Sequence, residues 1–413
     1  MGLNHKMKNR SVPFSSIIFA LLLTGFVAVV SQTLLIRELL ITFSGNELTI
    51  GIIIANWVFL TAVGSIIFAH LADRIRNRIL VFILAQIVIA FYLPLSIYLT
   101  RNIKNIVGIL PHETLGFFST FYLSFGLLAV LCIFIGALFV LGCRIYAELL
   151  KNSEVNIVGR GYVIDALGHM LGGIIFTYIL VTRYTSWEVS FIAGELLLFS
   201  AFWLSKRLNK KIYALSILLL FFLNSAVIYI GLPRKLHQKS LADQWKNLNL
   251  LHYENTIYNN IVTLKNAEQY TFCTNGVPMI TVPIPDIIYS EEYTHLSLLH
   301  HPVPKKILLI GAGAGGILNE LLKYSLLEKI DYVEPDPRLI EVIKMYPTEL
   351  TVKELADRRV QLVHTDARLF LRSLQEKYDL ILLNLPAPTS LSINRFYTLE
   401  FFEMTRDKLL PDG

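Results

Sequence analysis

The chain has 413 residues, enough for two or three domains. Hydrophobic residues make up 54% of it and charged residues only 16%, and the mean hydropathy of +0.55 exceeds what the core of a soluble globular protein needs. These values exclude an ordinary soluble protein and predict that lipid covers part of the surface. The net charge of +6 does not indicate nucleic-acid binding, because the basic residues cluster near the ends of apolar runs rather than in one patch.

Apolar runs of about 20 residues, the length that crosses a bilayer, recur through the first half of the chain. We therefore predict a transmembrane domain of about seven helices over residues 1–232. The first run is too long for a signal peptide and lacks an obvious small-residue cleavage site. The predicted spans are Phe14–Leu35, Leu48–His70, Leu80–Leu99, Gly116–Leu141, Gly161–Val181, Val189–Leu204 and Ile212–Leu232.

Basic residues are dense before the first span and after the second, fourth and sixth spans. The positive-inside rule therefore places the N-terminus in the cytoplasm of an integral, multi-pass protein, such as one of a bacterial inner or plasma membrane. Seven spans would put the C-terminal domain outside, and six or eight would put it inside, so its side stays open. The dense groups are Lys6, Lys8 and Arg10; Arg74, Arg76 and Arg78; Arg144, Lys151 and Arg160; and Lys206, Arg207, Lys210 and Lys211, whereas the intervening loops offer mainly Arg37, Arg101, Lys104 and Arg183.

Ionisable residues inside predicted spans suggest function, because burying them in lipid is costly. Asp165 and His169 lie four residues apart on one helix face, and Glu195 lies in the next span. Two interpretations stay open: a proton or cation relay, which would suit a polyamine transporter, or a polar clamp between helices beside the small residues Gly168 and Gly172.

The composition changes after the last span. Residues 233–249 are predicted as a basic juxtamembrane linker, and residues 250–300 as a small antiparallel β-rich lead-in followed by a helix. Asn275-Gly276 is typical of the turn of a β-hairpin. The pair His300-His301 precedes a proline and has no second ligand cluster, so we predict the end of a helix and no metal site.

A glycine-rich turn organises the rest of the chain. The apolar run Ile307–Ile310 predicts a buried parallel strand, and the glycines from Gly311 to Gly316 predict a tight turn before a helix. A second strand, Ile330–Val333, ends at Glu334, about 20 residues after the turn, where an acid commonly binds the hydroxyls of a ribose. This order indicates a nucleoside-binding domain.

Strands and helices continue to alternate down to Pro411-Asp412-Gly413. Such a turn normally introduces another strand, so we expect a sheet whose last strands are missing. The fold class expected for the whole chain is an N-terminal all-α multi-span membrane bundle, then an α/β Rossmann-like (methyltransferase-type) domain with the β lead-in. The Rossmann-like domain would cover residues 301–413 and be C-terminally truncated.

The order of motifs over residues 250–413 resembles the spermidine synthase (polyamine aminopropyltransferase) family, in its membrane-fused form. The segments that carry the resemblance are Glu254–Asn260, Asn275-Gly276, the gate-helix segment Asp286–His295, the turn Gly311–Gly316, Glu334, Asp366-Ala367 and Leu391–Tyr397. Gln32–Leu39 and Gly161–Gly168 resemble the helices of the membrane-bound members. The chain departs from the family where aspartates are expected: Ala314 in the turn, and Asn384 and Ala387 in the catalytic loop.

The resemblance implies a set of site residues. The catalytic positions would be Asn384 and Tyr289. The nucleoside would be bound by Gly311, Gly313, Gly316, Glu334, Asp366 and Ala367, and the amine by Tyr258, Asp286 and Glu291. Carboxylates normally attract the cationic substrates and take a proton from the amine; asparagine can orient an amine but cannot take its proton.

The resemblance implies a membrane-bound transferase that moves an aminopropyl group from decarboxylated S-adenosylmethionine to an amine. The alternative is a catalytically silent domain that binds a nucleoside or polyamine and is coupled to a membrane sensor or transporter. Decarboxylated S-adenosylmethionine, or S-adenosylmethionine itself, would be a cosubstrate rather than a tightly bound cofactor. The expected partners are a small amine or polyamine and the lipid bilayer, with a homodimer as a possible assembly and no nucleic acid.

Overall fold

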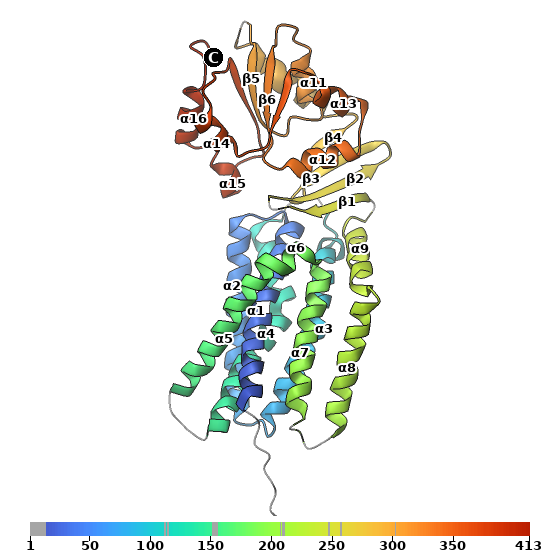
Figure 1. Cartoon of the computed structure of the whole chain (residues 1–413), viewed down its shortest axis with the longest axis vertical. Helices are drawn as coiled ribbons and strands as arrows, with labels where there is room; N and C mark the ends of the chain where they lie inside the picture. Colours follow the sequence, from blue (N-terminus) through green and yellow to red (C-terminus); the bar gives the residue numbers. More distant parts are fainter. Residues whose placement is uncertain are drawn as a thin grey trace, which may run out of the picture. The chain divides into compact units, whose positions relative to one another are not determined.

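The computed structural model describes residues 14–110, 113, 115–150, 156–206, 208, 211–246, 248–256, 258–301 and 303–413. The chain forms two compact units, which we describe separately (Figure 1). The helical unit comprises residues 1–42, 48–109 and 115–244, and the α/β unit comprises residues 43–47, 110–114 and 245–413. Several of the basic residues counted above (Lys6, Lys8, Arg10, Lys151, Arg207 and Lys210) lie outside the described residues.

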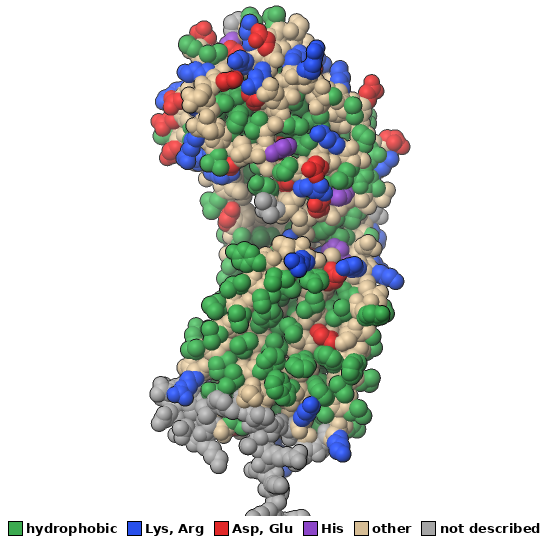
Figure 2. Space-filling model, viewed as in Figure 1, with side chains coloured by type: hydrophobic (Ala, Val, Ile, Leu, Met, Phe, Trp, Pro, Cys, Tyr) green, Lys and Arg blue, Asp and Glu red, His purple; other side chains and the backbone are tan. Residues whose placement is uncertain are grey.

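Seven helices of the helical unit are long and apolar enough to cross a membrane, which confirms the predicted number among the residues described. Their outward side chains are apolar: Val58 and Phe59 are 60% and 58% exposed, and Leu219 is 68% exposed. Figure 2 shows hydrophobic side chains covering the visible face of these helices. These seven are α1 (Phe14–Phe43), α2 (Glu47–Ala72), α3 (Arg78–Val107), α4 (Phe117–Leu150), α5 (Asn156–Ile175) continued by η1 (Phe176–Leu180) and α6 (Val181–Arg183), α7 (Ser186–Ser205) and α8 (Lys211–Tyr229). The shorter helix α9 (Leu232–Gln244) follows them.

The ionisable residues within the spans lie between pairs of helices. Asp165 of α5 contacts His169 at 3.4 Å between carboxylate oxygen and Nδ1. One helical turn after Asp165, a Cβ at Gly168 would lie within 3.0 Å of the backbone of α1, so α1 and α5 pack closely together. On α7, Glu195 accepts hydrogen bonds from Asn224 and Ser225 of α8. The Glu195 bonds join α7 to α8 as in a polar clamp between helices, whereas the Asp165–His169 contact lies within α5.

Two features of the sequence were interpreted wrongly in detail. The basic segment expected to link the two halves is largely helix α9, because Ser240 and Leu241 are buried where it packs on α3 and α7. Arg101, counted as a loop charge, belongs to α3 and is only 1% exposed. Its guanidinium pairs with Glu38 at 2.7 Å and donates to Ser240 Oγ at 2.8 Å. Arg101 therefore carries no information about membrane orientation.

The α/β unit begins with an antiparallel sheet in the order β1-β2-β3-β4. Its last hairpin turns at Asn275 and Gly276, whose φ angles of +51° and +79° explain why this pair predicted the turn. Helix α10 (Ile287–Leu298) follows, begun by Asp286 as its N-cap. The strands are β1 (Asn249–Asn255), β2 (Asn260–Asn266), β3 (Gln269–Thr274) and β4 (Val277–Val282).

A parallel sheet in the order β7-β6-β5-β8 forms the centre of this unit. Side chains alternate along β5: Ile307 and Leu309 pack into one hydrophobic cluster, and Leu308 and Ile310 pack into another. The predicted fold class is confirmed in outline: a helical N-terminal region of apolar helices, then an α/β domain with a parallel sheet. The elements are β5 (Lys306–Gly311), α11 (Ile317–Leu322), β6 (Lys329–Val333), α12 (Pro337–Met345), α13 (Glu349–Ala356), β7 (Val360–Val363), α14 (Ala367–Ser373), β8 (Leu380–Asn384), α15 (Leu391–Asn394) and α16 (Leu399–Arg406).

Candidate active site

The strand order of the parallel sheet reverses beside β5. From β5 the chain runs to β6 and β7 on one side of the sheet and then returns to β8 on the other. Ligands of such sheets bind outside the carboxyl ends of the strands, where the order reverses. Gly311 ends β5, Glu334 follows β6, Asp366 follows β7 and Asn384 ends β8, so the fold brings these four predicted residues to one edge.

The glycine turn leaves no room for side chains at its two ends. Gly311 has φ +95°, and a Cβ there would lie within 3.0 Å of the carbonyl oxygen of Asn384. Gly316 has φ +130°, and a Cβ there would lie 2.6 Å from Ser290 Oγ. Ala314 is buried, 4% exposed. The turn is thus fixed by its neighbours, and its backbone can approach a ligand closely.

Glu334 is the most strongly perturbed acid at this edge. Its side chain is buried, and this burial, together with the charge of Asp336, raises its pKa to about 7 although the amide of Asp336 donates to its carboxylate at 3.1 Å. Asp336 is fully buried, caps α12 through the amide of Arg338, and accepts a 2.7 Å hydrogen bond from Thr256 Oγ1. A buried acceptor next to a second carboxylate suits a ligand with paired hydroxyl donors.

Asp366 has its carboxylate already engaged. One oxygen caps α14 by accepting from the amides of Arg368 and Leu369 at 3.0 and 3.2 Å, and the other pairs with Arg395. Ala367, the first residue of α14, is 3% exposed. Asp366 therefore helps to build the edge of the sheet at β7.

Asn384 ends β8, at the start of the loop that precedes α15. Its amide nitrogen donates to the carbonyl of Ala312, and its amide oxygen accepts from the Tyr289 hydroxyl at 2.7 Å. The ring of Tyr289 stacks on that of Tyr293 at 5.6 Å. Burial, with smaller effects from Tyr397 and Asp286, raises the pKa of Tyr289, so its phenol stays protonated near neutral pH. It can donate a hydrogen bond but is a poor base.

The three residues assigned to the amine serve different roles. Asp286 accepts from the amide of Tyr289 at 3.0 Å and so caps α10. Glu291 is exposed and lies two residues after Tyr289, on another face of the helix. Tyr258 is 53% exposed, and its amide donates to Thr256 Oγ1 at 3.1 Å.

Sequence reasoning missed two side chains at this edge. Tyr397 donates to the carbonyls of Leu385 and Pro386 at 3.3 Å and so braces the loop after β8. Glu354 of α13 accepts hydrogen bonds from the backbone of the glycine turn. Tyr397 lay within a segment that carried the family resemblance, whereas nothing in the local sequence of Glu354 signalled a contact 39 residues away.

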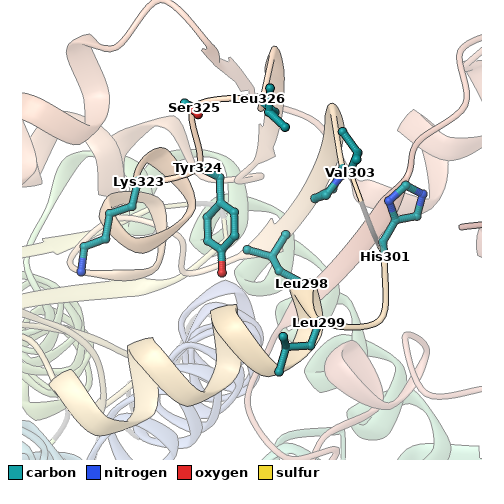
Figure 3. Close-up of a pocket in the computed structure, with 9 residues that line it drawn as sticks. Leu298, Leu299, His301, Val303, Lys323, Tyr324, Ser325 and Leu326 are labelled. Atoms are coloured by element: carbon teal, nitrogen blue, oxygen red, sulfur yellow. The ribbon is translucent and has the colours of Figure 1, made fainter.

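A cavity of about 440 Å³ lies elsewhere, between the end of α10 and the loop from α11 to β6 (Figure 3). Leu298, Tyr324 and Leu326 contribute to its lining. Nearby, Nε2 of His301 lies 3.6 Å from the Asp379 carboxylate, so this member of the histidine pair contacts an acid of the fold. The cavity is at the amino ends of the strands and is separate from the candidate site.

Comparison with known proteins shows what the chain is similar to. Residues 286–413 match the spermine/spermidine synthase domain. Polyamine aminopropyltransferase 2 of Aquifex aeolicus is 26% identical over 403 residues, which cover 94% of this chain and 76% of the Aquifex protein. The polyamine aminopropyltransferase of Oceanobacillus iheyensis is 25% identical over 86% of this chain and 68% of its own length. That of Clostridium beijerinckii is 35% identical over 164 residues, which are 40% of this chain and 57% of its own length.

The alignment with the Aquifex protein extends through the helical unit, whereas the alignment with the Clostridium protein spans only 164 residues. The resemblance inferred from the motifs is confirmed by these matches. Over residues 286–413 the chain matches the spermine/spermidine synthase domain, and over most of its length it is similar to polyamine aminopropyltransferases.

Proposed function

We propose that this protein is a membrane-bound aminopropyltransferase that moves the aminopropyl group of decarboxylated S-adenosylmethionine to an amine or polyamine. One observation carries the proposal. The carboxyl ends of the parallel strands bring the glycine turn, Glu334 and the Asn384–Tyr289 pair to one edge of the sheet in a spermidine synthase-like domain.

The nucleoside would lie along β5 and β6. Glu334 would accept from the ribose hydroxyls, and the backbone of the turn from Gly311 to Gly316 would face the 5′ end, as in other α/β nucleoside sites. The sulfonium and its aminopropyl chain would then extend toward Asn384 at the end of β8.

The amine would be oriented by neutral groups. Asn384 offers an amide oxygen, now bound by Tyr289, and the stacked rings of Tyr289 and Tyr293 offer π-faces to a cation. In the transfer, the amine nitrogen bonds to the chain carbon attached to sulfur, the carbon–sulfur bond breaks, and methylthioadenosine leaves with the electron pair. The amine proton passes to solvent.

The seven apolar helices support the membrane location. Their length suits a bilayer, and their outward side chains, among them Val58 and Leu219, would be costly to expose to water.

A second function follows from the end of β8. Where the resembled family has two aspartates, this chain has Ala387 and Asn384, whose amide already bonds to Tyr289 and Ala312. General-base catalysis contributes about 10²–10⁴-fold to a rate, so this loss favours a silent domain that binds a nucleoside or polyamine and is coupled to the membrane helices.

One assay separates the two functions. The full chain in lipid nanodiscs is given decarboxylated S-adenosylmethionine and putrescine, and methylthioadenosine and spermidine are measured by mass spectrometry. We expect the native chain to form both products and the double variant Asn384→Asp/Ala387→Asp to form them about 100-fold faster. Ser392→Asp, which adds a carboxylate on the exposed helix α15, is the matched control and should leave the rate unchanged.

The outcomes are distinct. Product from the restored variant alone would establish the silent domain. Methylated product from S-adenosylmethionine, with none from the decarboxylated donor, would replace aminopropyl transfer by methyl transfer. If the native chain also fails to bind methylthioadenosine at millimolar concentration, the nucleoside site itself is wrong.

A further inference from the structure

Glu354 fills the place where a nucleotide site would hold a phosphate. One of its carboxylate oxygens accepts from the amide of Gly315 at 2.7 Å. The other accepts from the amides of Gly316 at 2.7 Å and Asn319 at 3.0 Å. These are the free amides at the start of the helix that follows the glycine turn, the groups that bind pyrophosphate in dinucleotide-binding folds.

The carboxylate is held firmly in this place. Glu354 is 0% exposed, and α13, which carries it, begins with a capping box at Thr348 and Thr351. Three hydrogen bonds to one carboxylate are of the charge-assisted kind, which is about twice as strong as a neutral bond. A ligand could use these amides only by displacing a buried side chain of the protein.

The opposite side of the turn offers no second place for an anion. A Cβ at Gly315 would lie 2.7 Å from Ile280, and a Cβ at Gly316 would lie 2.6 Å from Ser290 Oγ. The turn is therefore packed between β4 and α10 on one side and is bonded to Glu354 on the other. The nearest acids along the nucleoside path, Glu334 and Asp336, add negative charge.

We infer that Glu354 is a specificity-determining residue, which makes the site accept nucleosides with a neutral or cationic 5′ substituent and reject those with a 5′-phosphate. The inference rests on the proposed nucleoside site and adds a residue and a rule of selection to it. Glu354 acts through the turn and does not need to touch the nucleoside. Burial raises the pKa of Glu354, and its charged form, which can accept all three amide hydrogen bonds, prevails as the pH rises.

Paired ligands test the inference on the full chain in nanodiscs. Isothermal titration calorimetry at pH 8 compares adenosine, methylthioadenosine and AMP. The native protein should bind adenosine and methylthioadenosine at least tenfold more tightly than AMP. An affinity for AMP within threefold of that for adenosine would overturn the inference, and this measurement needs no variant.

Two variants separate Glu354 from the other acids. Glu354→Gln keeps the shape but loses the charge and one acceptor, so the preference for adenosine over AMP should fall to threefold or less. Glu349→Gln removes an exposed carboxylate of the same helix and should keep the native ratio. Because both ligands are measured on each protein, a partly folded sample changes the number of sites but not the ratio.

A native ratio retained in Glu354→Gln would assign the discrimination to Glu334 and Asp336 and overturn the inference. Failure of the proposed function would look different: the native protein would then bind neither adenosine nor methylthioadenosine.

Discussion

The two halves of the candidate site differ in how their polar groups are tied to the fold. In the nucleoside half, Asp336 and Asp366 cap helices and Glu354 bonds to the glycine turn, so these carboxylates stabilise the structure whatever reaction occurs. In the acceptor half, Asn384 and Ala387 have neutral side chains. Folding therefore requires the carboxylates of the nucleoside half, whereas nothing in the fold requires an acid at the end of β8. Binding and chemistry can therefore be lost separately.

Gly311 is the point where the halves meet, and Gly311→Ala should have the largest effect. A Cβ there clashes with the carbonyl oxygen of Asn384, and alanine is strained at φ +95°. We expect a loss of about 2–4 kcal/mol in the stability of the α/β unit, with binding and transfer lost together. Thermal unfolding followed by circular dichroism measures this.

Gly108→Ala is the matched control for this change. Gly108 has φ +76°, but nothing lies within 4 Å of the position that a Cβ would take, so only the backbone strain of about 1 kcal/mol should appear. Equal effects of the two substitutions would show that the contact between β5 and the β8 loop is not tight.

Glu334→Gln should affect the nucleoside half alone. A carboxylate that accepts from two hydroxyls contributes about 1.5–3 kcal/mol for each charged hydrogen bond, and glutamine keeps one acceptor. We expect the affinity for methylthioadenosine to fall about 30-fold, measured by calorimetry. Glu403→Gln, at an exposed position of α16, should bind normally. If Glu334→Gln binds methylthioadenosine as tightly as the native protein does, Glu334 does not bind the ribose.

The pH dependence of binding gives a smaller effect with a definite sign. The pKa of Glu334 is about 7 in the free protein, and hydroxyl donors bind its charged form. Affinity for methylthioadenosine should therefore rise about tenfold from pH 6 to pH 8 and level off above. Glu334→Gln should flatten this curve. A curve that stays steep in the variant would assign the titration to another group.

The same shift acts on stability in the opposite direction. The folded pKa of about 7 lies above the ordinary value of 4.5, so the folded protein holds the proton more tightly than the unfolded chain. The contribution of Glu334 to the stability of the ligand-free protein is complete below pH 4.5 and is lost as the pH rises through 7. Ligand should offset this loss, so the thermal shift caused by methylthioadenosine should grow over the same interval.

Local patterns explain what could be predicted from the sequence. The seven long helices, the strand Ile307–Ile310 and the hairpin at Asn275-Gly276 each follow from hydrophobic length or turn chemistry within a few residues. Because parallel strands end at the same edge of a sheet, the residues that follow them could also be placed at that edge. The buried ion pair of Arg101 and Glu38 could not be predicted, because 63 residues separate the two partners and each alone is typical of a charge in a loop.

Contacts between distant segments also explain what was missed in the site. Glu354 is one of two acids on a short amphipathic helix, and only the packing of α13 on α11 brings it to the turn. Asp286 was assigned to the amine, yet its position before α10 also fits the N-cap that the structure shows. The sequence shows where an acid lies along the chain, but only the folded geometry shows whether that acid caps a helix or faces a ligand.

Tyr289→Phe should give the smallest effect and test the acceptor half by itself. It removes the hydroxyl that donates to Asn384 at 2.7 Å but keeps the ring stacked on Tyr293. Loss of one neutral hydrogen bond costs about 1 kcal/mol, so kcat/KM for the amine should fall about fivefold. The affinity for methylthioadenosine should not change, because Glu334 and the glycine turn are untouched. Tyr229→Phe, at an exposed position of α8, is the control. A parallel loss of nucleoside affinity in Tyr289→Phe would mean that the two halves are one cooperative unit, contrary to the separation argued from their hydrogen bonds.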